Sequence, residues 1–379
     1  MKPTAEIVII GAGVIGCSTA YHLAKAGIAD VTVLEMDQVG AGTSSKSASM
    51  LSMQFGRDPL LARMAQYSYR RYMEFESELG SPIDFRKTGW ISVAAGEAAA
   101  NLRRHAEGLL ALGIPTELLT PDEVKYRYPE LNTADIELGT FGPDDGPFDP
   151  HMIMWGYVKK ATEMGVTFVQ GEKATGLRIE AGRVTGVETG SGSIAAPTVV
   201  NAAGPWAAEV GRWAGVGIPL TNRTRTIVMT GPLPDIPADR PFVEDETVEW
   251  YFRPETGGVL MGMGNVPAKS PEAVLDTEMV NAIVDHAVHR VPVLEKASLL
   301  TAWSGVRPLT EDGRPIFGRL PGLDGFLLNC GWGGMGIIQS PAAGQLMAEL
   351  VRDGQTSTFG TDDFLLARFA ESDRTRSQT

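Results

Sequence analysis

Apolar and polar residues at the start of the chain follow a strand–helix–strand pattern. Glu6–Ile10 ends in four consecutive apolar β-branched residues without polar alternation, which predicts a strand buried on both faces. Cys17–Ala26 carries apolar residues at helical spacing, and Gly27 supplies a stop signal for that helix. Val31–Leu34 is a second buried run, so this part of the chain predicts a β-α-β unit with parallel strands.

The rest of the chain alternates between helical and strand periodicities. Apolar residues at helical spacing predict further helices at Leu60–Leu79, Phe148–Gly165, Asp276–His289 and Ile338–Val351. Alternating residues between turn signals predict strands within Phe168–Thr189, Arg223–Thr230 and Val248–Gly262. The mixture of both element types indicates an α/β protein.

Composition narrows the class of protein. At about 150 residues per domain, the 379 residues predict two domains or three. Lys and Arg total 33 against 46 Asp and Glu, and this net charge of −13 argues against nucleic acid and anionic membrane surfaces as partners. No apolar run is long enough to form an integral membrane segment. Cys17 and Cys330 cannot make a disulfide framework, so we expect a cytoplasmic, reduced protein.

Three glycines follow the first predicted strand at the spacing of a dinucleotide-binding turn. Gly11 permits the tight turn, Gly13 lets the backbone approach a pyrophosphate, and Gly16 allows close packing of helix on strand. A diphosphate would lie at the helix N-terminus, where unpaired N–H groups and the helix dipole favour anions. Glu35 is placed to accept hydrogen bonds from ribose hydroxyls, and an acid there disfavours a 2′-phosphate. The sequence therefore predicts a dinucleotide other than NADP.

Three segments favour a flavin over a nicotinamide cofactor. Gly40–Leu51 is a loop of small residues that can bring many N–H and hydroxyl donors close to a ligand. Thr198–Ala207 is a buried strand that ends in a small-residue turn. Cys330–Ile337 is a glycine-rich turn before a helix, where N–H groups and the helix dipole can stabilise negative charge on a reduced flavin. Each segment alone fits an ordinary tight turn, but their joint occurrence with the glycine motif favours FAD.

These motifs resemble those of the D-amino-acid-oxidase-like flavoproteins. That family includes glycine oxidase, sarcosine oxidase, dimethylglycine dehydrogenase and the β subunits of heteromeric sarcosine oxidase and L-proline dehydrogenase. The resemblance covers nearly the whole chain and rests on Val8–Gly16, Gly42–Leu51, Leu119–Pro129, Asp144–Pro150, Val199–Ala207, Trp303–Gly318 and Gly331–Pro341. It implies an α/β fold with an FAD-binding Rossmann-type domain and a discontinuous second substrate domain built on a mixed or antiparallel sheet.

The resemblance also implies domain limits and cofactor-binding residues. The FAD-binding domain would comprise residues 1–85, 146–220 and 301–355, the substrate-binding domain 86–145 and 221–300, and the C-terminal tail 356–379. The family implies that FAD contacts Gly11, Ala12, Gly13, Val14, Ile15, Gly16, Glu35, Met36, Thr43, Ser44, Ser47, Ala48, Ser49, Met50, Leu51, Lys173, Ala174, Ala202, Ala203, Gly204, Trp206, Arg307, Gly333, Gly334, Met335, Gly336 and Ile337. Covalent-flavin sarcosine oxidases carry a cysteine near the position of Gly305, and none is present here, so FAD should be non-covalent.

Two residues are candidates for catalytic roles on the substrate side. Family members that oxidise amino acids place an arginine at the position of Arg307, whose planar fork can grip a substrate carboxylate. The alternative for Arg307 is a structural ion pair with Glu311 or Asp312. Tyr251 lies in the strand that in glycine oxidase supplies a tyrosine to the same carboxylate, and its alternative is a place in an aromatic core.

Other features of the sequence bear on the chemistry. The family's oxygen-activating lysine aligns with Leu260, so oxidase and dehydrogenase activity both stay open. His286 and His289 are three residues apart on a predicted helix, but no matching acid or cysteine motif accompanies them, and we interpret them as surface residues. We expect no metal site.

The resemblance implies an FAD-dependent amine oxidoreductase. Such an enzyme oxidises the C–N bond of a small amino acid or N-alkyl amino acid to an imine by hydride transfer to flavin N5, and oxygen or another electron acceptor re-oxidises the flavin. Two alternatives stay open. One is an FAD-dependent dehydrogenase of 2-hydroxy acids or glycerol phosphate, which would need a general base. The other is the flavin subunit of a heteromeric sarcosine oxidase or proline dehydrogenase, within a homo- or hetero-oligomer.

Overall fold

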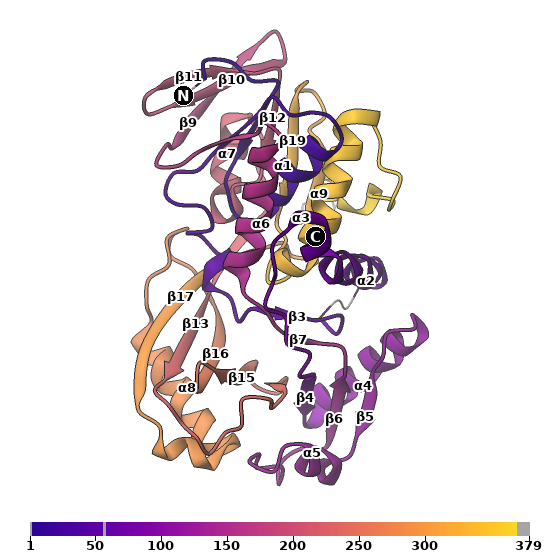
Figure 1. Ribbon diagram of the computed structural model, residues 1–379, viewed down its shortest axis with the longest axis vertical. Helices are drawn as coiled ribbons and strands as arrows, with labels where there is room; N and C mark the ends of the chain where they lie inside the picture. Colours follow the sequence, from indigo (N-terminus) through magenta and orange to yellow (C-terminus); the bar gives the residue numbers. More distant parts are fainter. Residues whose placement is uncertain (1, 56–57, 370–379) are drawn as a thin grey trace, which may run out of the picture.

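Two large sheets, in opposite halves of the molecule, organise the computed structural model, which describes residues 2–55 and 58–369 (Figure 1). The first sheet has the strand order β18-β19-β12-β1-β2-β8. Its strands are β1 (Ile7–Ile10), β2 (Val31–Leu34), β8 (Thr167–Val169), β12 (Thr198–Asn201), β18 (Ile316–Arg319) and β19 (Phe326–Cys330). All pairs are parallel except β18 with β19, which confirms the predicted α/β class.

Helices and a small sheet cover the two faces of this six-stranded sheet. The β1 strand is fully buried because both faces are covered, as its unbroken apolar run predicts. One core cluster joins β1 to the helices α1 (Val14–Lys25), α2 (Pro59–Met73), α3 (Phe75–Leu79), α6 (Pro150–Glu163) and α9 (Gly336–Asp353). A second cluster, on the other face, joins β1 to a three-stranded sheet and to helix α7 (Ala207–Trp213). The strands of this small sheet are β9 (Ala174–Glu180), β10 (Arg183–Thr189) and β11 (Gly192–Ala195).

The second large sheet is mixed and has eight strands in the order β17-β13-β16-β15-β14-β4-β6-β5. Within this sheet, as far as the structure describes it, the pair of β14 with β4 is parallel and the other pairs are antiparallel. The strands are β4 (Trp90–Ala94), β5 (Glu117–Leu119), β6 (Leu138–Gly142), β13 (Thr221–Thr230), β14 (Phe242–Asp245), β15 (Trp250–Glu255), β16 (Gly258–Pro267) and β17 (Leu299–Leu309). The mixed sheet agrees with the architecture that the family resemblance implies.

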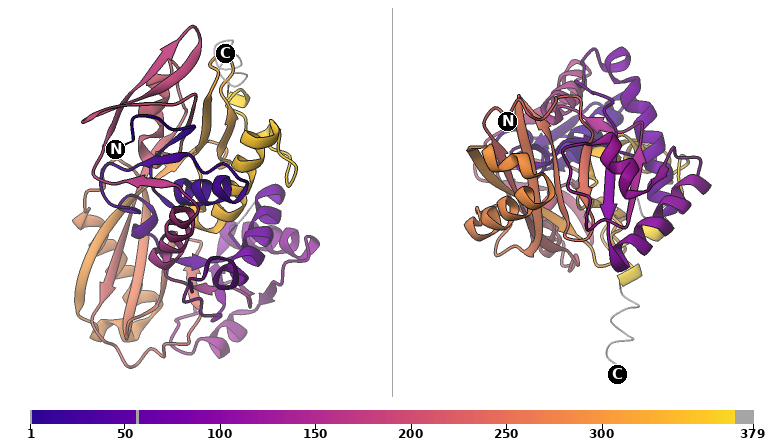
Figure 2. Two further views of the ribbon diagram at one scale, coloured as in Figure 1. Left: turned by 45° about the horizontal axis from the view of Figure 1, so that its top comes forward. Right: turned by 90° about the horizontal axis from the view of Figure 1, so that it is seen from below.

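The two faces of the mixed sheet differ in what they contact. Helix α8 (Thr277–Arg290) packs on its outer face, as the orange helix in Figure 2 shows, and α4 (Gly96–Ala111) and α5 (Pro121–Arg127) cover the strands near β6. The opposite face presents Trp90, Phe242 and Tyr251, which cluster with Met50. Met50 belongs to β3 (Met50–Leu51), which pairs with β7 (Gly146–Pro147) in a two-stranded sheet between the two halves.

Several predicted elements differ in detail from the observed ones. The predicted helix Leu60–Leu79 is two helices, α2 and α3, that meet at Glu74. Within Val248–Gly262 the chain forms a hairpin, because Thr256 and Gly257 both adopt positive φ, as a two-residue hairpin turn requires. The predicted domain limits stay a prediction; strand β17, from the range assigned to the FAD domain, pairs in the mixed sheet.

The described part of the predicted tail is packed onto the body of the protein. The Glu349 carboxylate accepts hydrogen bonds from the N–H groups of Ser357 and Thr358, and Phe364 is fully buried. Residues 370–379 of the tail lie outside the described residues. No helix in the described part of the chain is long and apolar enough to cross a membrane.

A buried charge cluster anchors α8 to the mixed sheet. Asp245 on β14 is 1% exposed and accepts hydrogen bonds from Arg290 at 2.7 Å and His286 at 3.1 Å. Burial by itself would raise the pKa of Asp245, but His286 and Arg290 outweigh burial and lower it. The interpretation of both histidines as surface residues was wrong for His286, because the helix turns it toward the buried carboxylate.

Replacement of Arg290 tests this anchor. Arg290→Met leaves Asp245 as a buried carboxylate without its main partner and should cost about 3–5 kcal/mol of unfolding free energy at neutral pH. The cost should shrink as the pH falls below the ordinary Asp pKa of 3.8, because a protonated Asp245 no longer needs a cation. Urea unfolding at several pH values measures both effects.

The matched control for Arg290→Met is Lys296→Met. Lys296 forms an exposed ion pair with Asp235 at 2.9 Å, so its loss should change stability by no more than about 0.5 kcal/mol. Equal destabilisation by the two substitutions would show that the buried cluster contributes no more than a surface pair.

Candidate active site

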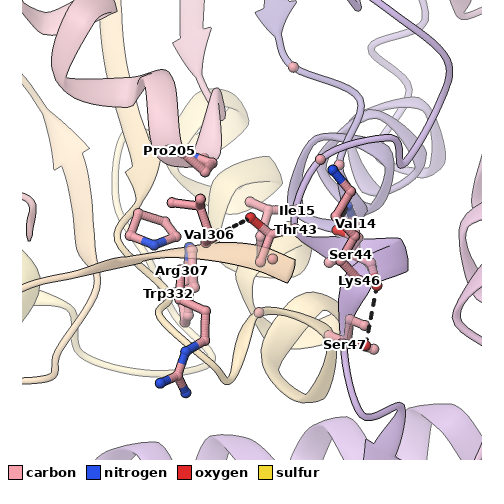
Figure 3. Close-up of a pocket in the computed structure, with 18 of the residues that line it drawn as sticks. Val14, Ile15, Thr43, Ser44, Lys46, Ser47, Pro205, Val306, Arg307 and Trp332 are labelled. Carbon is pink, nitrogen blue, oxygen red and sulfur yellow. Dashed lines mark hydrogen bonds between the residues drawn. The ribbon is translucent and has the colours of Figure 1, made fainter. Parts of the chain in front are cut away.

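A cavity of about 460 Å³ lies where the first βα turn, the 41–50 loop, the turn after β12 and the turn before α9 converge. Figure 3 shows Val14, Ser44 and Ser47 on one side of it and Val306 and Arg307 on the other. Long-range folding therefore brings together all three segments that the sequence singled out for a flavin.

The first βα turn approaches its neighbours so closely that only glycine fits. A Cβ on Gly11 would lie 2.6 Å from the carbonyl oxygen of Ala202, and Gly11 has a φ of +103°. A Cβ on Gly16 would lie 1.9 Å from the carbonyl oxygen of Gly11. The N-cap residue Gly13 has no side chain to cap α1, the N–H of Val14 donates to the Ser44 hydroxyl at 3.0 Å, and the first turn carries no acidic residue. These features leave the helix N-terminus available to a diphosphate, as predicted.

Glu35 orders the same turn from the end of β2. Its carboxylate accepts hydrogen bonds from the N–H groups of Ala12 at 2.9 Å and Asp37 at 3.1 Å. Burial raises the pKa of Glu35 despite these bonds. Glu35 lines the cavity beside Met36, Lys173 and Ala174, so this end of the cavity offers a carboxylate to ribose hydroxyls.

The small-residue loop is tied to strand β17 of the mixed sheet. The Thr43 hydroxyl donates a hydrogen bond to the carbonyl oxygen of Val306, and the Ser47 hydroxyl donates to Ser44 (Figure 3). A Cβ on Gly305 would lie 3.0 Å from Lys46, so the loop and the strand are in close contact. This contact fixes the position of Arg307, two residues further along β17, relative to the dinucleotide turn.

The turn before α9 forms the wall opposite the loop. Met335 is the N-cap residue of α9 and makes no side-chain capping bond, so the helix N–H groups are not satisfied by a side chain. A Cβ on Gly334 would lie 3.1 Å from Nη1 of Arg307. The glycine therefore lets the arginine side chain pass close to the helix N-terminus.

Most residues that the family resemblance assigned to FAD line this cavity. Those that do so are Gly11, Gly13, Val14, Ile15, Glu35, Met36, Thr43, Ser44, Ser47, Ala48, Ser49, Met50, Lys173, Ala174, Ala202, Ala203, Gly204, Trp206, Arg307, Gly333, Gly334, Gly336 and Ile337. Ala12, Gly16 and Leu51 do not line it, and Met335 lines an adjoining cavity of about 420 Å³. The role of each residue in binding FAD stays a prediction.

Arg307 and Tyr251 both line the larger cavity. Arg307 donates from Nη2 to the side-chain oxygen of Asn265 at 3.0 Å, and its buried Nε has no hydrogen-bond partner in the structure. It makes no ion pair within the described residues, so the alternative pairing with Glu311 or Asp312 does not occur; Asp312 pairs with Arg368. Burial and the nearby Arg225 lower the pKa of Arg307. Such a cation gains most from an anionic ligand.

Aromatic side chains surround the arginine. Tyr251 is 4% exposed, and its ring stacks on Phe242 with ring centroids 5.4 Å apart. Trp90 and Phe55 complete this wall. The neighbouring Trp250 is instead buried in the core on the other face of the sheet. Burial raises the pKa of Tyr251, so its hydroxyl stays protonated near neutral pH and can donate a hydrogen bond.

Sequence reasoning missed several charged residues of the cavity, and Arg225 and Glu244 are those that lie beside Tyr251. Both lie on strands of the mixed sheet, β13 and β14. A charged residue at an inward position of an alternating strand was the available signal, but the orientation of each strand depends on sheet pairing far away in the sequence. Within the described residues, no group of three or more His, Cys, Asp or Glu side chains is arranged to hold a metal ion.

The fold and the cavity together define a dinucleotide-binding protein whose cavity ends beside an arginine. The model of the DAO family, FAD dependent oxidoreductase, matches residues 6–350, and the chain belongs to this family. FAD is therefore the cofactor. The glycine cradle fits it, and so do the N-termini of α1 and α9, which carry no acidic residue in their first turns. Its non-covalent attachment stays a prediction.

The chain resembles proteins that act on small amino acids. It is 32% identical to a mitochondrial sarcosine dehydrogenase of Mus musculus over 94% of this chain and 40% of that protein, so it spans about two fifths of that relative. The structure of L-proline dehydrogenase from P. horikoshii has a TM-score of 0.90 and 27% identity, covering 98% of this chain and 99% of that one. Glycine oxidase from Geobacillus kaustophilus has a TM-score of 0.87 and 28% identity, covering 97% and 99%.

Substitution of Gly16 tests the glycine cradle. Gly16→Ala places a methyl group against the carbonyl oxygen of Gly11 and should push α1 away from β1, at a cost of about 3 kcal/mol. Purified protein should then carry much less flavin, which its visible absorbance measures. Gly108→Ala is the matched control, because a Cβ there meets no atom within 4 Å and helix α4 tolerates alanine. Full flavin content in Gly16→Ala would contradict the close approach.

Proposed function

We propose that the protein is an FAD-dependent oxidoreductase that oxidises the C–N bond of a small amino acid or N-alkyl amino acid to an imine. The observation that carries the proposal is the half-buried side chain of Arg307, which lines the cofactor cavity without an ion-pair partner among the described residues. The printed names of the sarcosine, proline and glycine enzymes above support the same class of substrate.

In this proposal the chain binds and orients the substrate. Arg307 holds the substrate carboxylate through its unoccupied N–H groups, and the Tyr251 hydroxyl donates to the same carboxylate. Fixing the carboxylate at one point orients the adjacent C–N bond, which is catalysis by positioning. Trp90, Phe55 and Phe242 exclude water from this end of the cavity. Bound FAD supplies the acceptor for the electron pair.

The N–H groups at the start of α9 have a second role in this proposal. They present partial positive charge at the wall of the cavity near Arg307, where negative charge on a reduced flavin would be stabilised. No histidine among the described residues lines the larger cavity. A neutral amine substrate needs no general base, whereas the oxidation of an alcohol does, so the amine is favoured over a 2-hydroxy acid or glycerol phosphate.

A role as the flavin subunit of a larger complex is the second candidate. The chain is 27% identical to sarcosine oxidase subunit beta of Rhodobacter capsulatus over 98% of this chain and 90% of that protein. In this case a partner subunit would carry the electrons onward, and the protein alone would be re-oxidised slowly by oxygen. Re-oxidation of the reduced protein by oxygen, measured with and without co-purified partner chains, separates the two cases.

Substitution of Arg307 tests the proposed function. Arg307→Met should lower kcat/KM for amino acids by roughly a hundredfold or more, because the substrate carboxylate would lose a charge-assisted partner. Arg307→Lys should fall in between, since lysine keeps the charge but lacks the planar fork. Anaerobic bleaching of the flavin absorbance by glycine, sarcosine and proline measures the rate.

The control is Arg319→Lys, because Arg319 hydrogen-bonds the carbonyl oxygen of Leu350 and lines neither cavity. Arg319→Lys should bleach at the rate of the wild type. If Arg307→Met also bleaches at that rate, Arg307 does not bind the carboxylate. If no amino acid bleaches the wild-type flavin, the proposed substrate class is wrong.

A further inference from the structure

A second arginine faces the same space as Arg307. In the antiparallel pair β13–β17, Arg225 lies opposite Gly305, and Arg223 lies opposite Arg307. Because side chains two residues apart share a face of a strand, Arg225 and Arg307 belong to one face of the mixed sheet. Both arginines line the cofactor cavity and also the adjoining cavity of about 420 Å³. A ligand that extends between the two cavities would therefore meet both guanidiniums.

Strand β16 is irregular opposite Arg225. The register shift between β13 and β16 places two residues of β16, Gly264 and Asn265, opposite the single residue Arg225, so β16 carries a bulge there. Bulges are often found near active sites, where they change the direction of a side chain, and Asn265 accepts a hydrogen bond from Arg307. The Arg225 guanidinium lies over the Tyr251 ring, 4.8 Å from its centroid. This cation–π contact holds the guanidinium beside the residue proposed to assist carboxylate binding.

Within residues 2–55 and 58–369, the hydrogen bonds of Arg225 go to no carboxylate. Its Nη2 donates to the backbone carbonyl oxygen of Glu249 at 2.7 Å, and its buried Nε has no hydrogen-bond partner in the structure. Like Arg307, Arg225 makes no ion pair among the described residues. Two guanidiniums with unused N–H donors thus share one cavity, and their proximity contributes to the lowered pKa of Arg307. Glu244 and Glu249 act on this pKa in the opposite direction, so part of the positive charge is already offset. A substrate with one carboxylate would contact one guanidinium and leave the other without that contact.

We propose that Arg225 is a second anion-binding residue and that the preferred substrate is an amino acid with two carboxylates, one on Arg307 and the other on Arg225. The inference rests on the proposed function, since it places the first carboxylate on Arg307. In this proposal Arg225 determines the specificity among substrates that differ only in the group distal to the first carboxylate. The class includes N-carboxyalkyl glycines and acidic amino acids. Glu244 lines the same cavity and would disfavour a second carboxylate placed elsewhere than on Arg225.

The experiment is a set of matched substrates with anaerobic flavin reduction as the readout. It compares iminodiacetate with its monoamide, aspartate with asparagine, and sarcosine with glycine as monocarboxylate references, and ornithine supplies a distal cation. The wild type should reduce fastest with the dicarboxylates, with kcat/KM at least about tenfold above that of the matching amide. The higher kcat/KM should come mainly from a lower KM, because Arg225 acts on binding.

Substitution then assigns the preference to one residue. Arg225→Gln should reduce the ratio of kcat/KM for dicarboxylate over amide to near one, and Arg225→Lys should recover part of it. Arg183→Gln is the charge-matched control, because the Arg183 side chain is exposed at the start of β10 and lines neither cavity. It should keep the ratio of the wild type.

A binding measurement keeps the proposal testable if Arg225→Gln does not fold. Thiodiacetate and methylthioacetate differ by one carboxylate and carry no oxidisable amine, and each should perturb the flavin spectrum of the wild-type protein on binding. Thiodiacetate should bind at least about tenfold more tightly to the wild type, and Arg225→Lys should narrow that difference.

The outcomes separate this inference from the proposed function. Equal kcat/KM for acids and amides, or a ratio unchanged by Arg225→Gln, overturns the role of Arg225 while the proposed function stands. A preference for ornithine overturns it too, and would identify Glu244 as the distal determinant. Absence of flavin reduction by every amino acid tested would instead reject the proposed function itself.

Discussion

Close approach of backbone to backbone is the constraint on which the rest of this structure depends. The turn after β1 can pass close to the backbone of Ala202 and lead into α1 only because Gly11 and Gly16 have no side chain. That approach places the N-terminus of α1, whose first turn carries no acidic residue, at the edge of a parallel sheet, where the helix dipole favours an anion. The glycines before α9 repeat the arrangement on the opposite wall. These two walls of the cavity are therefore defined by backbone, and the side chains around Arg307 come from elsewhere.

Those side chains are contributed by the mixed sheet. Arg307 and Tyr251 lie on β17 and β15, whereas the dinucleotide turn belongs to the six-stranded sheet. The hydrogen bond from Thr43 to Val306 couples the two halves directly beside Arg307. A substrate carboxylate would gain charge-assisted hydrogen bonds from the Arg307 guanidinium, which has no ion-pair partner among the described residues. This division separates the cofactor-binding backbone from the groups that select the substrate.

Features formed by residues close together in the sequence could be predicted, whereas features formed by residues far apart in the sequence could not. The β-α-β unit and its glycines were predictable because strand, turn and helix are contiguous in sequence. Arg307 and Tyr251 came from the family resemblance, and the structure brings them into one cavity. Arg225 was missed because the face of the sheet on which it lies depends on the pairing of β13 with β17, about 80 residues later in the chain. The burial of His286 was missed for the same kind of reason, since its partner Asp245 is 41 residues earlier in the chain.

The most direct test of this account is a crystal structure of the protein with FAD and a carboxylate that cannot be oxidised, such as methylthioacetate. The account predicts that the diphosphate lies at the N-terminus of α1 and that both oxygens of the carboxylate lie within hydrogen-bonding distance of the Arg307 guanidinium. A carboxylate held by other residues, or a flavin bound outside the cavity between Gly11 and Gly334, would contradict it.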